Sequence, residues 1–68
     1  MSMVQIVTTP NEVNASLIKG FLRSNGIQAS YAPNAGKNGQ VASCTVYCTD
    51  DKAEAALRLL KEQGLIKS

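Results

Sequence analysis

The first candidates for chemistry in this 68-residue chain are its two cysteines, because thiols at a suitable spacing can bind metals or form redox pairs. Cys44 and Cys48 are separated by three residues, which is not the C-x-x-C spacing of a redox pair. The sequence contains no histidine that could complete a zinc site. On a strand the two thiols lie on one face about 13 Å apart, too far for a disulfide. We therefore expect two buried free thiols, no metal and no cofactor.

The adjacent carboxylates of Asp50 and Asp51 are the second candidate for chemistry, as an acid–base pair. Their position before an apolar helical run favours a different role, because acidic residues complement the positive end of a helix dipole. Serine hydroxyls are present, but a Ser-His-Asp arrangement is excluded without histidine. We expect no catalytic residues and a chain that is not an enzyme.

A glycine-rich segment, Gly36-Lys37-Asn38-Gly39, lies inside a predicted loop over residues 33–40. Backbone amides and a lysine in such a loop can converge on an anion. The segment is not a Walker loop, and a flexible hairpin connection explains it as well. If the chain binds a small ligand, an anion or a nucleotide, the candidate ligand-binding residues come from this loop and from the turn after the first strand. They are Lys37, Asn38, Thr9 and Asn11.

Charge and composition argue against two classes of partner. The net charge is only +2, the seven basic residues are scattered, and Phe21, Tyr31 and Tyr47 are the only aromatic residues. A nucleic-acid-binding domain normally shows a basic stripe, so no nucleic-acid partner is expected. The chain begins without a signal peptide, and no apolar run approaches the ~20 residues that span a bilayer. Together with free thiols, this predicts a cytoplasmic protein that does not contact a membrane.

Two segments of the chain, 15–27 and 53–65, resemble each other, and each predicts a helix that ends at a glycine, Gly26 or Gly64. Runs 3–8, 27–32 and 41–48 have the β-branched or alternating pattern of strands. Thr9 and Glu12 form the pattern of a capping box, with Pro10 at the first helical position. The helical spacing predicts a buried stripe on the first helix. Its members are Val13, Leu17, Ile18, Phe21 and Leu22.

The element order β-α-β-β-α predicts an α+β, ferredoxin-like fold in a single domain, residues 1–68. Three strands in the order 1-3-2 are expected, with two helices on one face and a fourth strand reduced to a remnant after Gly64. The first strand would then be an exposed edge, and a domain this small gains stability from a partner. The edge and the open sheet face supply the candidate interface residues. They are Met3, Gln5, Val7, Thr45 and Tyr47.

The pattern resembles one bacterial family, called putative prokaryotic signal transducing protein. The resemblance is carried by Ala15, Ile18-Lys19, Leu22 and Gly26-Ile27, then Val46, Asp50-Asp51, Ala53, Ala56 and Leu59-Leu60. Membership implies a ferredoxin-like fold related in topology to the GlnB-type nitrogen regulators, and it implies no catalytic or ligand residues. The leading hypothesis is a non-enzymatic regulatory, signal-transducing or protein-interaction module that acts as a homo-oligomer, most simply a dimer. A second copy or another protein would bind the first-strand edge or the open face, and the alternative is a small-ligand sensor using the 33–40 loop.

Overall fold

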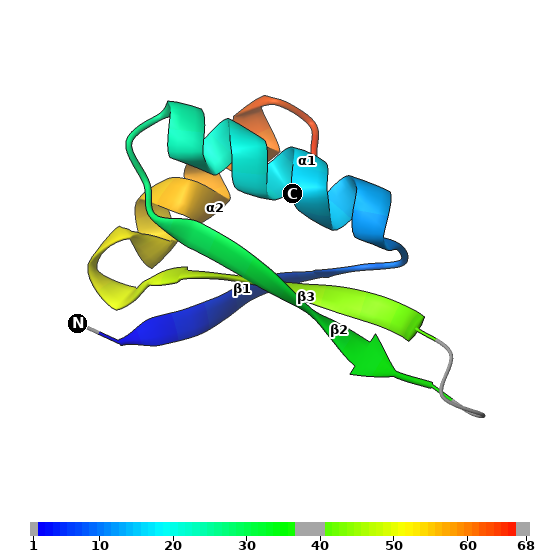
Figure 1. The fold of residues 1–68 in the computed structure, drawn as a ribbon. Helices are drawn as coiled ribbons and strands as arrows, with labels where there is room; N and C mark the ends of the chain where they lie inside the picture. Colours follow the sequence, from blue (N-terminus) through cyan, green and yellow to red (C-terminus); the bar gives the residue numbers. More distant parts are fainter. Residues whose placement is uncertain (1, 37–40, 67–68) are drawn as a thin grey trace.

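The chain folds into three strands and two helices arranged in two layers. The computed structural model describes residues 2–36 and 41–66. The elements are β1 (Met3–Thr9), α1 (Glu12–Ser24), β2 (Ala29–Ala35), β3 (Val41–Thr49), a 3₁₀ turn η2 (Asp50–Lys52) and α2 (Ala53–Glu62). The sheet order is β1-β3-β2, with β3 antiparallel to both neighbours, and both helices cover the same face (Figure 1). The predicted α+β architecture is confirmed.

The two glycines that the repeat aligns end their helices in the same way. Gly26 and Gly64 have φ angles of 80° and 72°, a region that other residues rarely adopt. The amide of the residue after each glycine, Ile27 or Leu65, donates to a carbonyl five residues earlier. This is the Schellman motif, which satisfies carbonyls that the last helical turn leaves without partners. The local sequence therefore sets both helix ends.

The core lies between the helices and the central strand. It takes alternate residues of β3 and one stripe from each helix, because strand side chains alternate and helical ones recur every three or four positions. The fully or nearly buried apolar residues are Ala15, Ile18, Leu22, Ile27, Ala29, Cys44, Val46, Cys48, Ala56 and Leu60. The prediction that both thiols are buried is confirmed.

The first helix begins at Glu12, and its N-cap is Asn11 rather than Thr9. The Asn11 Oδ1 atom accepts a hydrogen bond of 2.8 Å from the backbone amide of Asn14. Thr9 remains in β1, where it pairs with Cys44 across the sheet. A residue held in the strand ladder cannot also turn into the helix, so the cap moves two positions along the chain.

A short 3₁₀ turn precedes the second helix. Residues 50–52 form the 3₁₀ turn η2, and the α-helix starts at Ala53. Thr49 lies before that turn and makes no capping hydrogen bond with its side chain. Asp50 and Asp51 occupy the first turn, as expected, and complement the helix dipole there.

A β-bulge in β1 changes the predicted faces of that strand. Gln5 pairs with Tyr47, but Val7 pairs with Val46, so Ile6 is an extra residue in the ladder. One extra residue moves every following side chain to the other face. Val7 therefore packs against the core below the helices, and its predicted place on the open face is wrong.

Strand β2 extends through Pro33 and Asn34, where the sequence predicted a loop. It begins at Ala29, two residues later than predicted. Proline lacks an amide hydrogen, but β2 is an edge strand and can tolerate this residue. The rest of the predicted 33–40 loop, from Lys37 to Gln40, lies outside the described residues.

The predicted buried stripe on α1 is partly wrong. Ile18 and Leu22 are buried and Phe21 is half-buried, but Val13 and Leu17 are exposed by 72% and 56%. The helix instead turns a narrower face, centred on Ala15, Ile18 and Leu22, toward the sheet. Val13 and Leu17 are left on the solvent side because no helix or strand of residues 2–36 and 41–66 covers them.

The C-terminal tail does not form a fourth strand within the described residues. Leu65 and Ile66 form a bend after Gly64 and pack, half-buried, against the core. With Val7, Thr9 and Ile18 they line a small cavity of about 280 Å³. The outer edge of β1 consequently has no strand partner among residues 2–36 and 41–66.

Candidate functional site

Four of the five predicted interface residues share the open face of the sheet. Gln5 pairs directly with Tyr47, and paired residues of an antiparallel sheet point to the same side. Met3 and Thr45 lie on this face by alternation, two residues along their strands. Met3 and Gln5 are exposed, Tyr47 is half-buried and Thr45 is buried. Val7 is the member that the structure does not bring to this face.

The centre of the open face is polar rather than apolar. Asn34 on β2 donates from Nδ2 to the hydroxyls of Ser43 and Thr45 on β3, at 3.0 and 2.8 Å. These bonds hold two neighbouring strands together from the side that the helices leave open. A face whose polar groups bond to one another is stable in water, so it needs no apolar cover.

The predicted ligand residues are only partly brought together. Thr9 and Pro33 both pair with Cys44, so the last residues of β1 and β2 lie at one end of the sheet. The hydroxyl of Thr9 donates 2.7 Å to the carbonyl of Asn11, and the Asn11 side chain caps α1. Both side chains therefore support the backbone. Lys37 and Asn38 lie outside the described residues.

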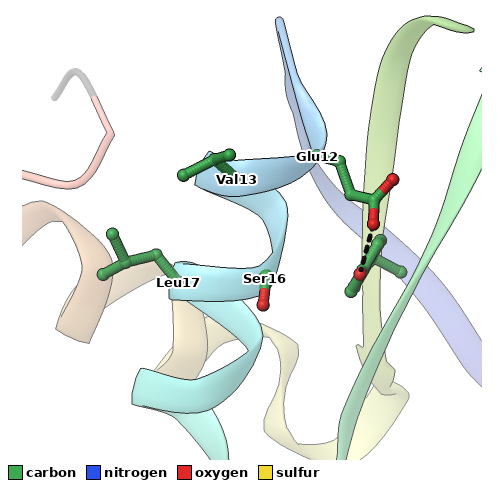
Figure 2. A pocket seen from close by; sticks show the side chains of 5 residues that line it. Glu12, Val13, Ser16 and Leu17 are labelled. Carbon is green, nitrogen blue, oxygen red and sulfur yellow. Dashed lines mark hydrogen bonds between the residues drawn. The ribbon is translucent and has the colours of Figure 1, made fainter.

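A groove that the sequence did not predict lies between α1 and β2. It measures about 630 Å³ and is lined by Glu12, Val13, Ser16 and Leu17 of the helix and by Tyr31 of the strand. Figure 2 shows the Val13 and Leu17 side chains directed to the same side of the helix, away from the Glu12 carboxylate. The groove thus has an apolar flank and a polar flank.

The polar flank of the groove is held together by Tyr31. Its hydroxyl donates a hydrogen bond of 3.3 Å to Oε1 of Glu12. The Nζ atom of Lys19 lies 5.5 Å from the centre of the Tyr31 ring, within cation–π range. Partial burial and the neighbouring Glu12 carboxylate raise the pKa of Tyr31. The phenol therefore stays protonated at neutral pH and remains a hydrogen-bond donor.

The sequence held a signal for this groove that the stripe prediction obscured. Leu17 and Ile18 are adjacent, so one broad apolar face seemed to include both. Helical spacing assigns the two residues to different rows. One row consists of Ala15, Ile18 and Leu22. The other begins with Val13 and Leu17 and continues to Gly20 and Ser24. Two rows on different sides of one helix indicate two contact surfaces.

The two thiols are packed into the core. Cys44 and Cys48 are both fully buried, four residues apart on the inner face of β3. Burial and the neighbouring Asp51 carboxylate raise the pKa of Cys48. A raised pKa lowers the fraction of reactive thiolate at Cys48.

The topology and surfaces define a small α+β domain of ferredoxin-like element order with an open sheet. The family model described as putative prokaryotic signal transducing protein matches residues 3–64, and the chain belongs to this family. Comparisons with curated proteins and with solved structures gave no match. Within residues 2–36 and 41–66, none of the helices has the length and apolar character needed to cross a membrane.

Proposed function

We propose that the chain is a non-enzymatic regulatory module of the cytoplasm that acts by associating with other chains, most simply as a homodimer. The family description names signal transduction. The absence of histidine from the sequence, the two buried free thiols and the small core support this role.

The observation that carries the proposal is the unprotected edge of β1. Edge strands expose unpaired amides and carbonyls, and proteins usually protect them with charge, proline or a bulge. The other edge strand, β2, carries Pro33, whereas β1 from Met3 to Thr9 contains neither proline nor a charged residue. Its bulge at Ile6 interrupts the ladder but leaves Met3 to Gln5 regular. This segment is suited to receive a strand from a second copy or from another protein.

The oligomeric state of the full chain tests the proposal first. Sedimentation and light scattering at micromolar concentration should show species larger than the 7.2 kDa monomer. A single folded monomer at all concentrations would contradict the homodimer.

A matched pair of substitutions tests the edge itself. Gln5 and Ser30 both pair with Tyr47, one on each edge strand, and both are exposed. If chains associate through β1, Gln5→Lys should weaken association because like charges would face each other across the new strand pair. Ser30→Lys adds the same charge at the other edge and should have no effect. Equal effects of the two variants would argue against β1.

A second candidate function is anion sensing at the end of the sheet where β1 and β2 finish. The pairing of both Thr9 and Pro33 with Cys44 supports it, because the last residue of β1 and the first residue of the predicted loop lie at the same end of the sheet. Thermal unfolding with inorganic phosphate and with nucleotides tests this function. A rise in unfolding temperature that Lys37→Ala abolishes would support it, and no rise would contradict it.

A further inference from the structure

The solvent side of α1 carries an uncharged row of residues. Val13, Leu17, Gly20 and Ser24 are spaced i, i+4, i+7 and i+11, so they share one face of the helix. All four are exposed, Val13 by 72% and Leu17 by 56%. This outer row lies opposite the buried positions of the helix, where a surface helix normally places charged residues. Its composition is that of a contact surface.

Among the residues that the structure describes, no contact explains a glycine at position 20, in the middle of the outer row. A Cβ atom added there would meet nothing within 4 Å, and its φ angle is not positive. Glycine is the least favourable helix residue after proline. The sheet does not approach Gly20, so the fold itself would accept a larger residue. A small residue is required only if something approaches α1 closely from outside.

We infer that the outer row is the surface on which a second copy of this chain docks, with the two α1 helices antiparallel. The order of side-chain sizes carries this assignment. The first half of the row is large, Val13 and Leu17, and the second half is small, Gly20 and Ser24. An antiparallel pair places Val13 opposite the partner's Ser24 and Leu17 opposite the partner's Gly20. A parallel pair would place large on large and leave a gap over the glycines.

The charges beside the outer row favour the same orientation. Glu12 lies at the start of α1 and Arg23 in its last turn, both exposed. The antiparallel pair brings Glu12 toward the partner's Arg23 at both ends of the contact. The groove shares Val13 and Leu17 with the outer row and has the Glu12 carboxylate on its other flank, where the partner's Arg23 can approach it. In a parallel pair the flank that carries Glu12 and Arg23 would lie on opposite sides of the contact in the two chains, so these charges would not meet.

This inference rests on the association between copies proposed above and adds a contact surface on α1. The β1 edge is a separate surface and stays available to a second copy or to a different protein. A single pair of 13-residue helices buries a small area, so we expect a weak and reversible dimer. Covalent trapping is therefore the appropriate test.

The test is oxidative cross-linking of the full chain with cysteines placed on the outer row. The double variant Val13→Cys/Ser24→Cys should form a covalent dimer under mild oxidation, because antiparallel packing sets the two positions opposite each other. Within one chain these positions are eleven residues apart, about 16 Å along the helix, too far for a disulfide. The single variant Val13→Cys should not cross-link. If the single variant cross-links to the same extent as the double variant, the helices are parallel and the inference is wrong.

Two further variants separate this inference from the proposed function. Gly20→Leu places a good helix former at an exposed position, so circular dichroism should show a folded chain while dimerisation weakens at least tenfold. Gln5→Lys should leave cross-linking of the double cysteine variant unchanged. If Gln5→Lys abolishes the dimer and the double cysteine variant does not cross-link, the homodimer stands but the α1 surface is wrong. If the chain neither dimerises nor cross-links, both proposals fail.

Discussion

At the scale of single residues, Asn11 shows how a long-range contact overrides a local motif. The pattern Thr9-x-x-Glu12 is a good capping box, yet the strand pairing of Thr9 with Cys44 prevents it from forming. Asn11 is the next suitable residue, and its extended backbone with φ of −154° is that of an N-cap. Strand pairing of Thr9 therefore determines which residue caps the helix.

Replacing Asn11 tests this assignment. Asn11→Ala should lower the free energy of unfolding by about 1 kcal/mol, because the amide of Asn14 loses its acceptor. Asn11→Asp keeps an acceptor and adds a negative charge at the positive end of the helix. Its free energy of unfolding should therefore equal or exceed that of the wild type. Urea unfolding at pH 7 gives both values. An equal loss in the two variants would show that the residue does not act as a cap.

The raised pKa of Cys48 predicts how the free energy of unfolding changes at alkaline pH. Its pKa is raised in the folded chain by burial first and by Asp51 second. Below the ordinary thiol pKa of about 8.5, both states are protonated and the stability is fully present. As pH rises from there through the raised pKa, the unfolded chain ionises first, so stability falls. Cys48→Ala should therefore show a shallower decline between pH 8 and 10 by urea unfolding. Parallel declines in the two chains would contradict this prediction.

At the scale of elements, the bulge in β1 decides which side chains the strand offers to each face. Simple alternation predicts Met3, Gln5 and Val7 on one side. The extra residue at Ile6 sends Val7 to the core and Thr8 to the open face, opposite Thr45. Nothing in the local sequence marks the bulge, since glycine is absent from β1 and register depends on β3.

Two substitutions that each introduce a carboxylate test the position of the bulge. Val7→Asp should lower the free energy of unfolding by about 2–3 kcal/mol, because a carboxylate would be placed against apolar core residues. Thr8→Asp, on the exposed side, should change it by no more than about 0.5 kcal/mol. Chemical denaturation compares the two. The reverse order would mean that the strand alternates without a bulge.

At the scale of the whole molecule, the tail after α2 replaces a fourth strand. Leu65 and Ile66 pack against the core and, with Val7 and Ile18, line the small cavity described above. These two residues thereby add apolar burial to a small core, and within residues 2–36 and 41–66 the outer edge of β1 has no strand partner.

Removing the tail's apolar side chains tests this contribution. Leu65→Ala/Ile66→Ala should lower the free energy of unfolding by about 2 kcal/mol, since both residues are half-buried. Gln63→Ala changes an exposed side chain in the same segment and should have little effect. Thermal and urea unfolding provide the comparison. If the double alanine variant is as stable as the control, the tail does not belong to the core.

The sequence by itself determined the element order, both helix ends and the burial of the two cysteines. Each of these depends on local physics: helical or strand periodicity, glycines that adopt positive φ, and small apolar residues on one strand face. The repeat of residues 15–27 at 53–65 already contained the two Schellman ends. The family resemblance agreed with this local pattern.

Only the tertiary structure decided the start of α1, the bulge at Ile6, the extension of β2 through Pro33 and the exposure of Val13 and Leu17. All four depend on partners distant in the sequence, since β3 fixes the register of its neighbours and the sheet takes only one narrow face of α1. Hydrophobic periodicity tells that a residue can be buried. Whether it is buried depends on what the rest of the chain places against it, and the described part of the chain places nothing against the outer row of α1.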